Sequence, residues 1–125
     1  MAKQITVECP QELAGIMIDA LNWFVAGHYP SGADECSIAA RDALFGLVHH
    51  FEQVLKAEGR CTYSIRMRAF LSEAIRSYFE QLAVQRGEQV SNRSRVLIAV
   101  CRGESNGADF EEAAALDAAA LPGPE

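Results

Sequence analysis

Two adjacent histidines are the only cluster of ionisable side chains whose spacing invites a catalytic or metal-binding interpretation. His49 and His50 lie near Asp42 and Glu52 in a segment with helical periodicity. Neighbouring residues on a helix point about 100° apart, so the two imidazoles do not easily share a metal ion. His49 and Glu52 have the three-residue spacing of helical metal sites, but two ligands do not fix zinc. We therefore predict a solvated surface here, with no metal, no cofactor and no catalytic site.

Glycine and cysteine patterns also predict a protein that is not an enzyme. Neither of the common glycine-rich phosphate loops, Gly-x-x-x-x-Gly-Lys-Ser/Thr and Gly-x-Gly-x-x-Gly, is present in the sequence. Structural zinc sites usually take their ligands in close pairs, whereas every cysteine of this chain stands alone. We expect four small buried thiols: Cys9, Cys36, Cys61 and Cys101.

Composition predicts one soluble domain. The chain has 125 residues, of which 50% are hydrophobic and 22% are charged, as is usual for a globular protein. No apolar run approaches the roughly 18 residues of a membrane span. The first residues contain no long apolar segment of the kind that a secretory signal needs. We therefore expect a cytoplasmic protein with no membrane contact.

Periodicity predicts an all-α fold of three long helices and one short helix in a compact bundle, with a short N-terminal β-strand. Ile5, Val7 and Cys9 alternate with polar residues, which predicts a strand whose partner is another segment or a second copy. Three stretches with helical spacing then end at Gly27, Gly59 and Gly87. The long helices are predicted at residues 10–26, at 36–58, and from Thr62 or Ser64 to Arg86.

The pattern of residues from Ser91 to Arg102 fits either a short helix or a buried strand. The length of the segment and the glycine at position 103 favour the helix. Ser91 or Asn92 is the candidate cap of this helix. Beyond it the composition changes, so we predict a helical domain over residues 1–103 and a tail over residues 104–125. This tail is acidic and rich in alanine, and we expect it to be weakly helical or disordered.

The first long helix is apolar on more than one side, which predicts that more than one surface covers it. Ile18, Trp23 and Val25 widen its apolar stripe on both flanks. Such a helix is either the centre of the bundle or part of a dimer interface. We predict a homodimer and take these three residues as its contacts, or as contacts to another partner.

Charge is unevenly distributed along the sequence. Residues 1–59 carry a net charge of −5, residues 60–102 carry +5, and residues 103–125 carry −6. Such asymmetry bears on association rather than on fold. We predict a non-enzymatic adaptor or inhibitor that binds a protein partner of unknown identity. The charge also raises the hypothesis that a mobile element encodes such an inhibitor.

One segment supports a different function. Val90 to Gly103, with Ala83 and Gly87 before it, resembles the recognition half of a helix-turn-helix DNA-binding protein. The resemblance implies a transcription regulator that uses residues 91–102, with nucleic acid as its partner. The DNA contacts in this alternative are five polar residues: Ser91, Asn92, Arg93, Arg95 and Arg102.

The strand-then-helix start resembles ribbon-helix-helix repressors, in which two copies pair their strands and read the major groove. The outward residues here would be Gln4, Thr6 and Glu8, in the part of the chain with a net charge of −5. A carboxylate that faces phosphates has the wrong sign, so we predict that this strand does not read DNA. Strand pairing between two copies remains open.

Overall fold

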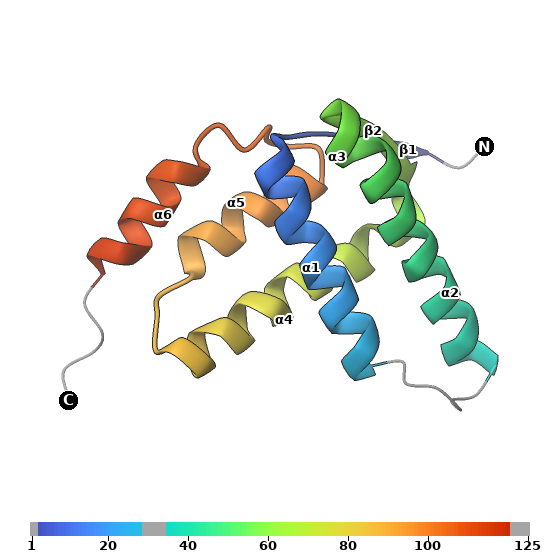
Figure 1. Ribbon diagram of the computed structural model, residues 1–125, viewed down its shortest axis with the longest axis horizontal. Coiled ribbons are helices and arrows are strands. Elements are labelled where there is room, and N and C mark those ends of the chain that lie inside the picture. Colours follow the sequence, from blue (N-terminus) through green and yellow to red (C-terminus); the bar gives the residue numbers. More distant parts are fainter. Residues whose placement is uncertain (1–2, 29–34, 121–125) are drawn as a thin grey trace.

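Five helices and one small sheet make up the part of the chain that the structure describes, which is residues 3–28 and 35–120 of a computed structural model (Figure 1). The chain order is β1 (Gln4–Glu8), α1 (Gln11–His28), α2 (Glu35–His50), a π-helical turn (Phe51–Leu55), α3 (Lys56–Glu58), β2 (Arg60–Ser64), a 3₁₀ turn (Ile65–Met67), α4 (Arg68–Arg86), α5 (Ser91–Cys101) and α6 (Phe110–Ala119). Because α2, the π turn and α3 follow one another directly, they form one long helix.

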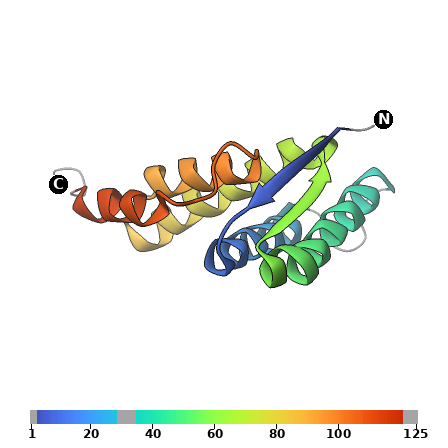
Figure 2. The same cartoon turned by 90° about the horizontal axis from the view of Figure 1, so that it is seen from above.

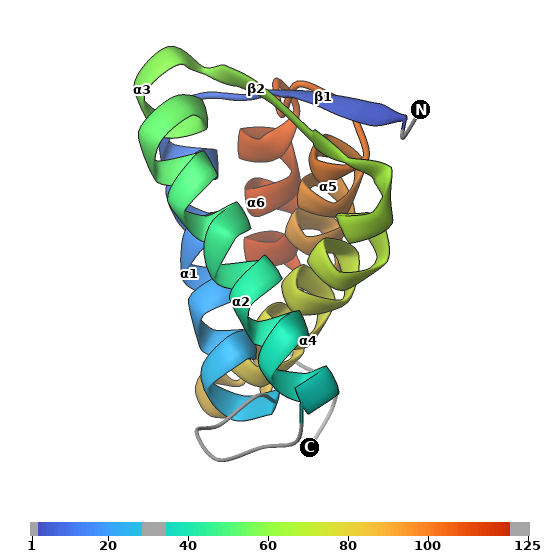
Figure 3. The same ribbon diagram turned by 90° about the vertical axis from the view of Figure 1, so that its right-hand side faces the viewer.

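The helices pack on one another in the order α2, α1, α4, α5, α6. Helices α4, α5 and α6 form one layer, and α1 and α2 form the second layer against it (Figure 2). The two strands lie across one end of the helices (Figure 3). Helices α2 and α6 are therefore the two edges of the assembly, and α1 and α4 lie at its centre.

The predicted N-terminal strand finds its partner inside the same chain. Strand β1 pairs antiparallel with β2, with Val7 opposite Cys61 and Ile5 opposite Tyr63. The prediction that a helix starts at Thr62 or Ser64 is therefore wrong, and α4 begins at Arg68. Cys61 and Tyr63 are buried while their neighbours are more exposed, which is the two-residue period of a half-buried strand.

Other sequence predictions agree with the structure. The second long helix, with its π turn included, ends at Glu58, and Gly59 follows it in the left-handed conformation with φ of 77°. Gly87 ends α4 in the same way, with φ of 64°. Residues 91–101 form a helix, as predicted, and not a strand. The fold has one more short helix, α6, than the predicted four.

Helix α1 is the central helix of the bundle, which explains its wide apolar surface. Ile18 and Val25 are only 6% and 1% exposed, and they belong to this chain's own core. They are therefore not free for a partner, which corrects that part of the prediction. Their contacts come from packing within one chain. Among the described residues, no helix combines the length and the apolar character that crossing a bilayer requires.

Candidate functional site between helices α5 and α6

One buried carboxylate connects α6 to the first turn of α5. The side chain of Asp117 on α6 is 1% exposed. Its Oδ1 accepts hydrogen bonds from the backbone N–H and from Nδ2 of Asn92, each at 3.0 Å. Its Oδ2 accepts bonds from the backbone N–H of Arg93 at 3.0 Å and from Nε of Arg93 at 2.9 Å. Four donors thus surround one carboxylate.

Asp117 therefore performs the role of a helix cap from a distant part of the chain. The residue at the N-cap of α5 is Val90, which has no side chain able to accept a hydrogen bond. The sequence prediction that Ser91 or Asn92 caps this helix is wrong, because both lie inside its first turn. A carboxylate at this end also interacts favourably with the helix dipole.

The environment of Asp117 favours its charged form. Burial by itself raises the pKa of this carboxyl group, but the hydrogen bonds from Arg93 and Asn92 outweigh burial. The result is a pKa below the usual value of 3.8. The contact is therefore an ion pair whose remaining acceptor positions are filled, which is the condition for a buried charge to be tolerated.

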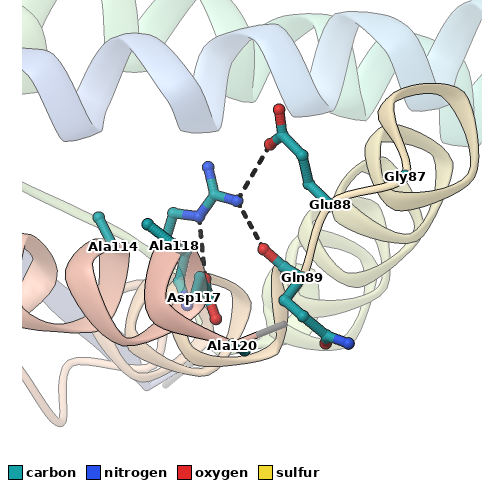
Figure 4. A pocket seen from close by; sticks show the side chains of 8 residues that line it. Gly87, Glu88, Gln89, Ala114, Asp117, Ala118 and Ala120 are labelled. Atoms are coloured by element: carbon teal, nitrogen blue, oxygen red, sulfur yellow. Dashed lines mark hydrogen bonds and ion pairs between the residues drawn. The ribbon is translucent and has the colours of Figure 1, made fainter. Parts of the chain in front are cut away.

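The guanidinium of Arg93 has three further neighbours. Its Nη2 donates to the carbonyl of Gln89 at 2.8 Å and lies 3.4 Å from the carboxylate of Glu88. Its central carbon lies 6.0 Å from the centre of the Phe79 ring. Arg93 also lines a surface hollow with a volume of about 410 Å³. Figure 4 shows Asp117, Glu88 and Gln89 gathered around this hollow. Arg93 thereby joins α6 to the turn between α4 and α5.

The structure gives most of the predicted DNA contacts partners inside the chain. Asn92 and Arg93 bind Asp117, and Nη2 of Arg95 donates to Oδ1 of Asn92 at 3.2 Å. Arg102 lies 3.4 Å from the carboxylate of Glu104, and Ser91 is exposed. Helix α5 also runs back alongside α4 (Figure 1), whereas the helices of a helix-turn-helix cross steeply.

A second cleft lies on the other side of α6. It has a volume of about 290 Å³ and lies between α5 and α6. Its apolar walls come from both helices: Val96, Ala99, Ala113 and Leu116. Its charged residues are two carboxylates, Asp109 and Glu112, and the guanidinium of Arg95 on α5. Leu116 is 54% exposed, so this apolar side chain is accessible from solvent. This cleft gives no signal in the sequence, because its walls come from two segments that show no shared pattern.

Trp23 is the one predicted partner contact that stays partly exposed. Its ring lies 6.0 Å from that of Tyr78 and 6.5 Å from that of His28, edge to face in both cases. Tyr78 comes from α4, so this contact also joins α1 to α4. The Trp23 side chain therefore helps to hold the two central helices together.

The two adjacent histidines do not form a shared site. His49 is exposed, and Nε2 of His50 lies 2.8 Å from the carbonyl oxygen of Thr62 on β2. Within residues 3–28 and 35–120, no three His, Cys, Asp or Glu side chains are grouped so that they could hold a metal ion. Three of the four cysteines are buried, but Cys36 on α2 is exposed, which corrects the prediction of four buried thiols.

The loop before α6 contains one motif that the sequence analysis overlooked. Residues 103–107 read Gly-Glu-Ser-Asn-Gly, which has the Gly-x-Ser-x-Gly spacing of a hydrolase nucleophile. That motif needs a strand before it and a helix directly after it, whereas this segment follows α5. Oγ of Ser105 instead accepts the backbone N–H of Gly107 at 3.0 Å. In this protein the segment is part of the loop that connects α5 to α6.

Comparisons with known proteins add no relative. Neither the protein-family models nor the curated proteins nor the solved structures contain a match to this chain. Any functional inference must therefore come from the residues themselves.

Proposed function

We propose that this protein acts by binding a partner protein, without catalysing a reaction, through an acidic surface on α6. The acidic surface consists of Asp109, the N-cap residue before α6, with Glu111, Glu112 and Leu116 of α6. Asp109, Glu112 and Leu116 also line the 290 Å³ cleft, which belongs to this surface. One observation carries the proposal. All three carboxylates are exposed, and none of them has an ion-pair partner within the described part of the chain.

The chemistry of this surface indicates the kind of partner. An apolar side chain of the partner would enter the cleft and contact Leu116 and Val96. Lysine or arginine residues beside that side chain would meet the carboxylates of Asp109 and Glu112. Charges at the rim of an interface mainly set the association rate and its salt dependence, while the buried apolar anchor supplies affinity. The partner we expect is therefore a basic segment with an apolar anchor.

A direct test uses a synthetic probe in place of the unknown partner. The probe is an 18-residue amphipathic peptide of leucine and lysine, and its control replaces every lysine with glutamate. We expect the lysine peptide to shift NMR signals of residues 104–116 and of Val96 in the ¹⁵N-labelled protein. Raising the salt concentration should weaken this binding, because exposed charges are screened. Affinity that stays the same from low to high salt would contradict the charge mechanism.

Two matched charge reversals locate the binding surface. The variant Glu111→Lys/Glu112→Lys should bind the lysine peptide at least tenfold more weakly. The control Asp19→Lys/Asp42→Lys makes the same change in net charge on exposed residues of α1 and α2, and should change affinity less than twofold. Equal losses in both variants would mean that the peptide senses only the overall negative charge.

The DNA-binding alternative has less support, because Asn92, Arg93 and Arg102 have partners inside the chain. It remains testable with a mobility shift of random duplex DNA at low salt. Binding that disappears in the variant Arg93→Ala/Arg95→Ala would favour DNA over a protein partner. No shift at low salt would end the alternative, since phosphate contacts dominate such binding.

A further inference from the structure

Helix α2 forms one edge of the assembly and leaves apolar side chains uncovered on its outer side. It packs mainly on α1, and α6 lies at the opposite edge (Figure 1). Ile38 is 37% exposed and Phe45 is 46% exposed. Seven residues separate them, so they lie on the same side of the helix, about two turns apart. A Cβ atom on exposed Gly46 would meet nothing within 4 Å, so another backbone can approach the helix closely here.

Groups of both charge signs stand on the same side of this helix as the two apolar residues. An arginine and an aspartate precede Phe45, and a histidine and a glutamate follow it. Spacings of three, four and seven residues place all of them on one face, which we call the α2 face: Ile38, Arg41, Asp42, Phe45, His49 and Glu52. Within the described part of the chain, none of its four polar side chains has an ion-pair partner. Nε of Arg41 is buried without a hydrogen bond.

The α2 face is complementary to a second copy of itself when the two helices run antiparallel. A two-fold axis between Phe45 and Gly46 brings each residue level with the one equally far from the axis on the other chain. Asp42 then lies level with the second copy's His49. Arg41 lies about 3 Å along the axis from the level of the second copy's Glu52, a distance that an arginine side chain spans. The two Phe45 rings meet beside the axis.

We propose that two copies of this protein form a two-fold symmetric dimer through α2, with Phe45 at its centre. Arg41 pairs with the second copy's Glu52, and each such pair occurs twice because the interface is isologous. The sequence predicts a homodimer through α1, whereas the uncovered residues lie on α2. One pair of helices buries no more than the roughly 1,200 Å² at the lower limit of stable interfaces, so we expect a weak dimer. Because α6 lies at the other edge, this inference is independent of the proposed function.

The oligomeric state of the unmodified protein is the first test, measured by sedimentation velocity from about 10 µM to about 1 mM. Reducing agent keeps the exposed Cys36 from cross-linking two chains. We expect the average mass to rise with concentration from that of one chain toward twice that value. A mass that stays that of one chain at about 1 mM would overturn the proposal and leave the α2 face to a different partner. Growth beyond two copies would contradict a closed two-fold contact.

A pair of matched variants tests whether the contact lies on α2. Phe45→Glu replaces the central apolar side chain, and the control Val84→Glu places the same charge at an apolar residue of α4 that is 81% exposed. We expect the dimer to dissociate at least tenfold more readily in Phe45→Glu and to change less than twofold in Val84→Glu. Circular dichroism checks that both variants keep the helical content of the unmodified protein. Equal losses in both variants would overturn the assignment to α2.

Charge reversal tests the antiparallel arrangement. Arg41→Glu sets two carboxylates against each other across the interface, and Glu52→Arg sets two guanidinium groups against each other. Exposed ion pairs contribute little individually, so we expect each variant alone to dimerise at least threefold more weakly. An equimolar mixture of the two variants should form mixed dimers with an affinity within twofold of the unmodified protein, because every reversed charge then meets an opposite one. Mixed dimers no tighter than those of either variant alone would contradict the pairing of Arg41 with Glu52.

Discussion

Oδ2 of Asp117 accepts two hydrogen bonds from Arg93, one from its backbone N–H at 3.0 Å and one from its Nε at 2.9 Å. One oxygen thus satisfies both an unpaired donor of the first turn of α5 and a charged side chain. The residues are 24 positions apart in the sequence. This contact determines where α6 lies and which arginines remain free, so several measurable properties depend on it.

Acid should open this contact before it unfolds the protein. A carboxyl group with a lowered pKa stabilises the folded state fully above its ordinary value of 3.8 and loses that contribution as pH falls through the lowered pKa. The charged groups that face it are Arg93 and, through Arg93, Glu88. NMR signals of the Asn92 and Arg93 amides should therefore titrate below pH 3.8. They should not titrate in Asp117→Asn, and a midpoint above this value would contradict the ion pair.

Gly103 should be far less tolerant of a side chain than Gly87. Both have positive φ, which costs an alanine roughly 1–2 kcal/mol, but only at Gly103 would the added Cβ lie within 4 Å of other atoms. The atom nearest to a Cβ on Gly103 would be the backbone oxygen of Thr6, so the main chain would have to shift to make room for it. We expect Gly103→Ala to lower the free energy of unfolding by about 2–4 kcal/mol and Gly87→Ala by about 1–2 kcal/mol. Urea denaturation measures both, and equal losses would contradict the close approach.

Tyr63 should stabilise the junction between β2 and the end of α5. Its hydroxyl donates a hydrogen bond to the buried carbonyl of Cys101. Tyr63→Phe removes this donor without changing the ring, so it should cost about 1–2 kcal/mol of unfolding free energy. The control is Tyr78→Phe, because Tyr78 is only partly buried and contacts Trp23 through its ring. Thermal or urea unfolding measures both variants. Equal losses of stability in Tyr63→Phe and Tyr78→Phe would contradict a stabilising hydrogen bond from Tyr63 to Cys101.

Thiol reactivity should single out Cys36. Burial raises the pKa of Cys9, Cys61 and Cys101 to about 11, so little reactive thiolate forms at these positions. Cys36 is exposed on α2. Mass spectrometry should therefore find one modified cysteine after brief iodoacetamide treatment of the folded protein at pH 8. It should find four after unfolding. Cys36→Ser should leave the folded protein unmodified, and early loss of a second thiol would contradict the burial.

Much of the fold was predictable because helices have local signals. Gly59 and Gly87, together with apolar residues at helical spacing, located the ends of two long helices. The predicted stop at Gly27 is wrong, because α1 continues through Gly27 to His28. The alternation of Ile5 and Val7 located β1. The start of α4 was not predictable in the same way, because Cys61 and Tyr63 give a strand signal of only five residues directly before a strong helical pattern. Pairing of residues 60–64 with β1 makes this segment a strand rather than the first turns of a helix.

The sequence by itself determined the number of long helices, their approximate extent apart from the start of α4, and the acidic character of the C-terminal segment. Only the tertiary structure decided which surfaces remain free. Ile18 and Val25 look like partner contacts in the sequence and are core residues in the fold. Arg93 looks like a free cation and is bound to Asp117, whose own segment of alanine and acidic residues gives no local sign of burial. Periodicity is a property of neighbours along the chain, whereas the partner of a buried charge depends on which helices pack together.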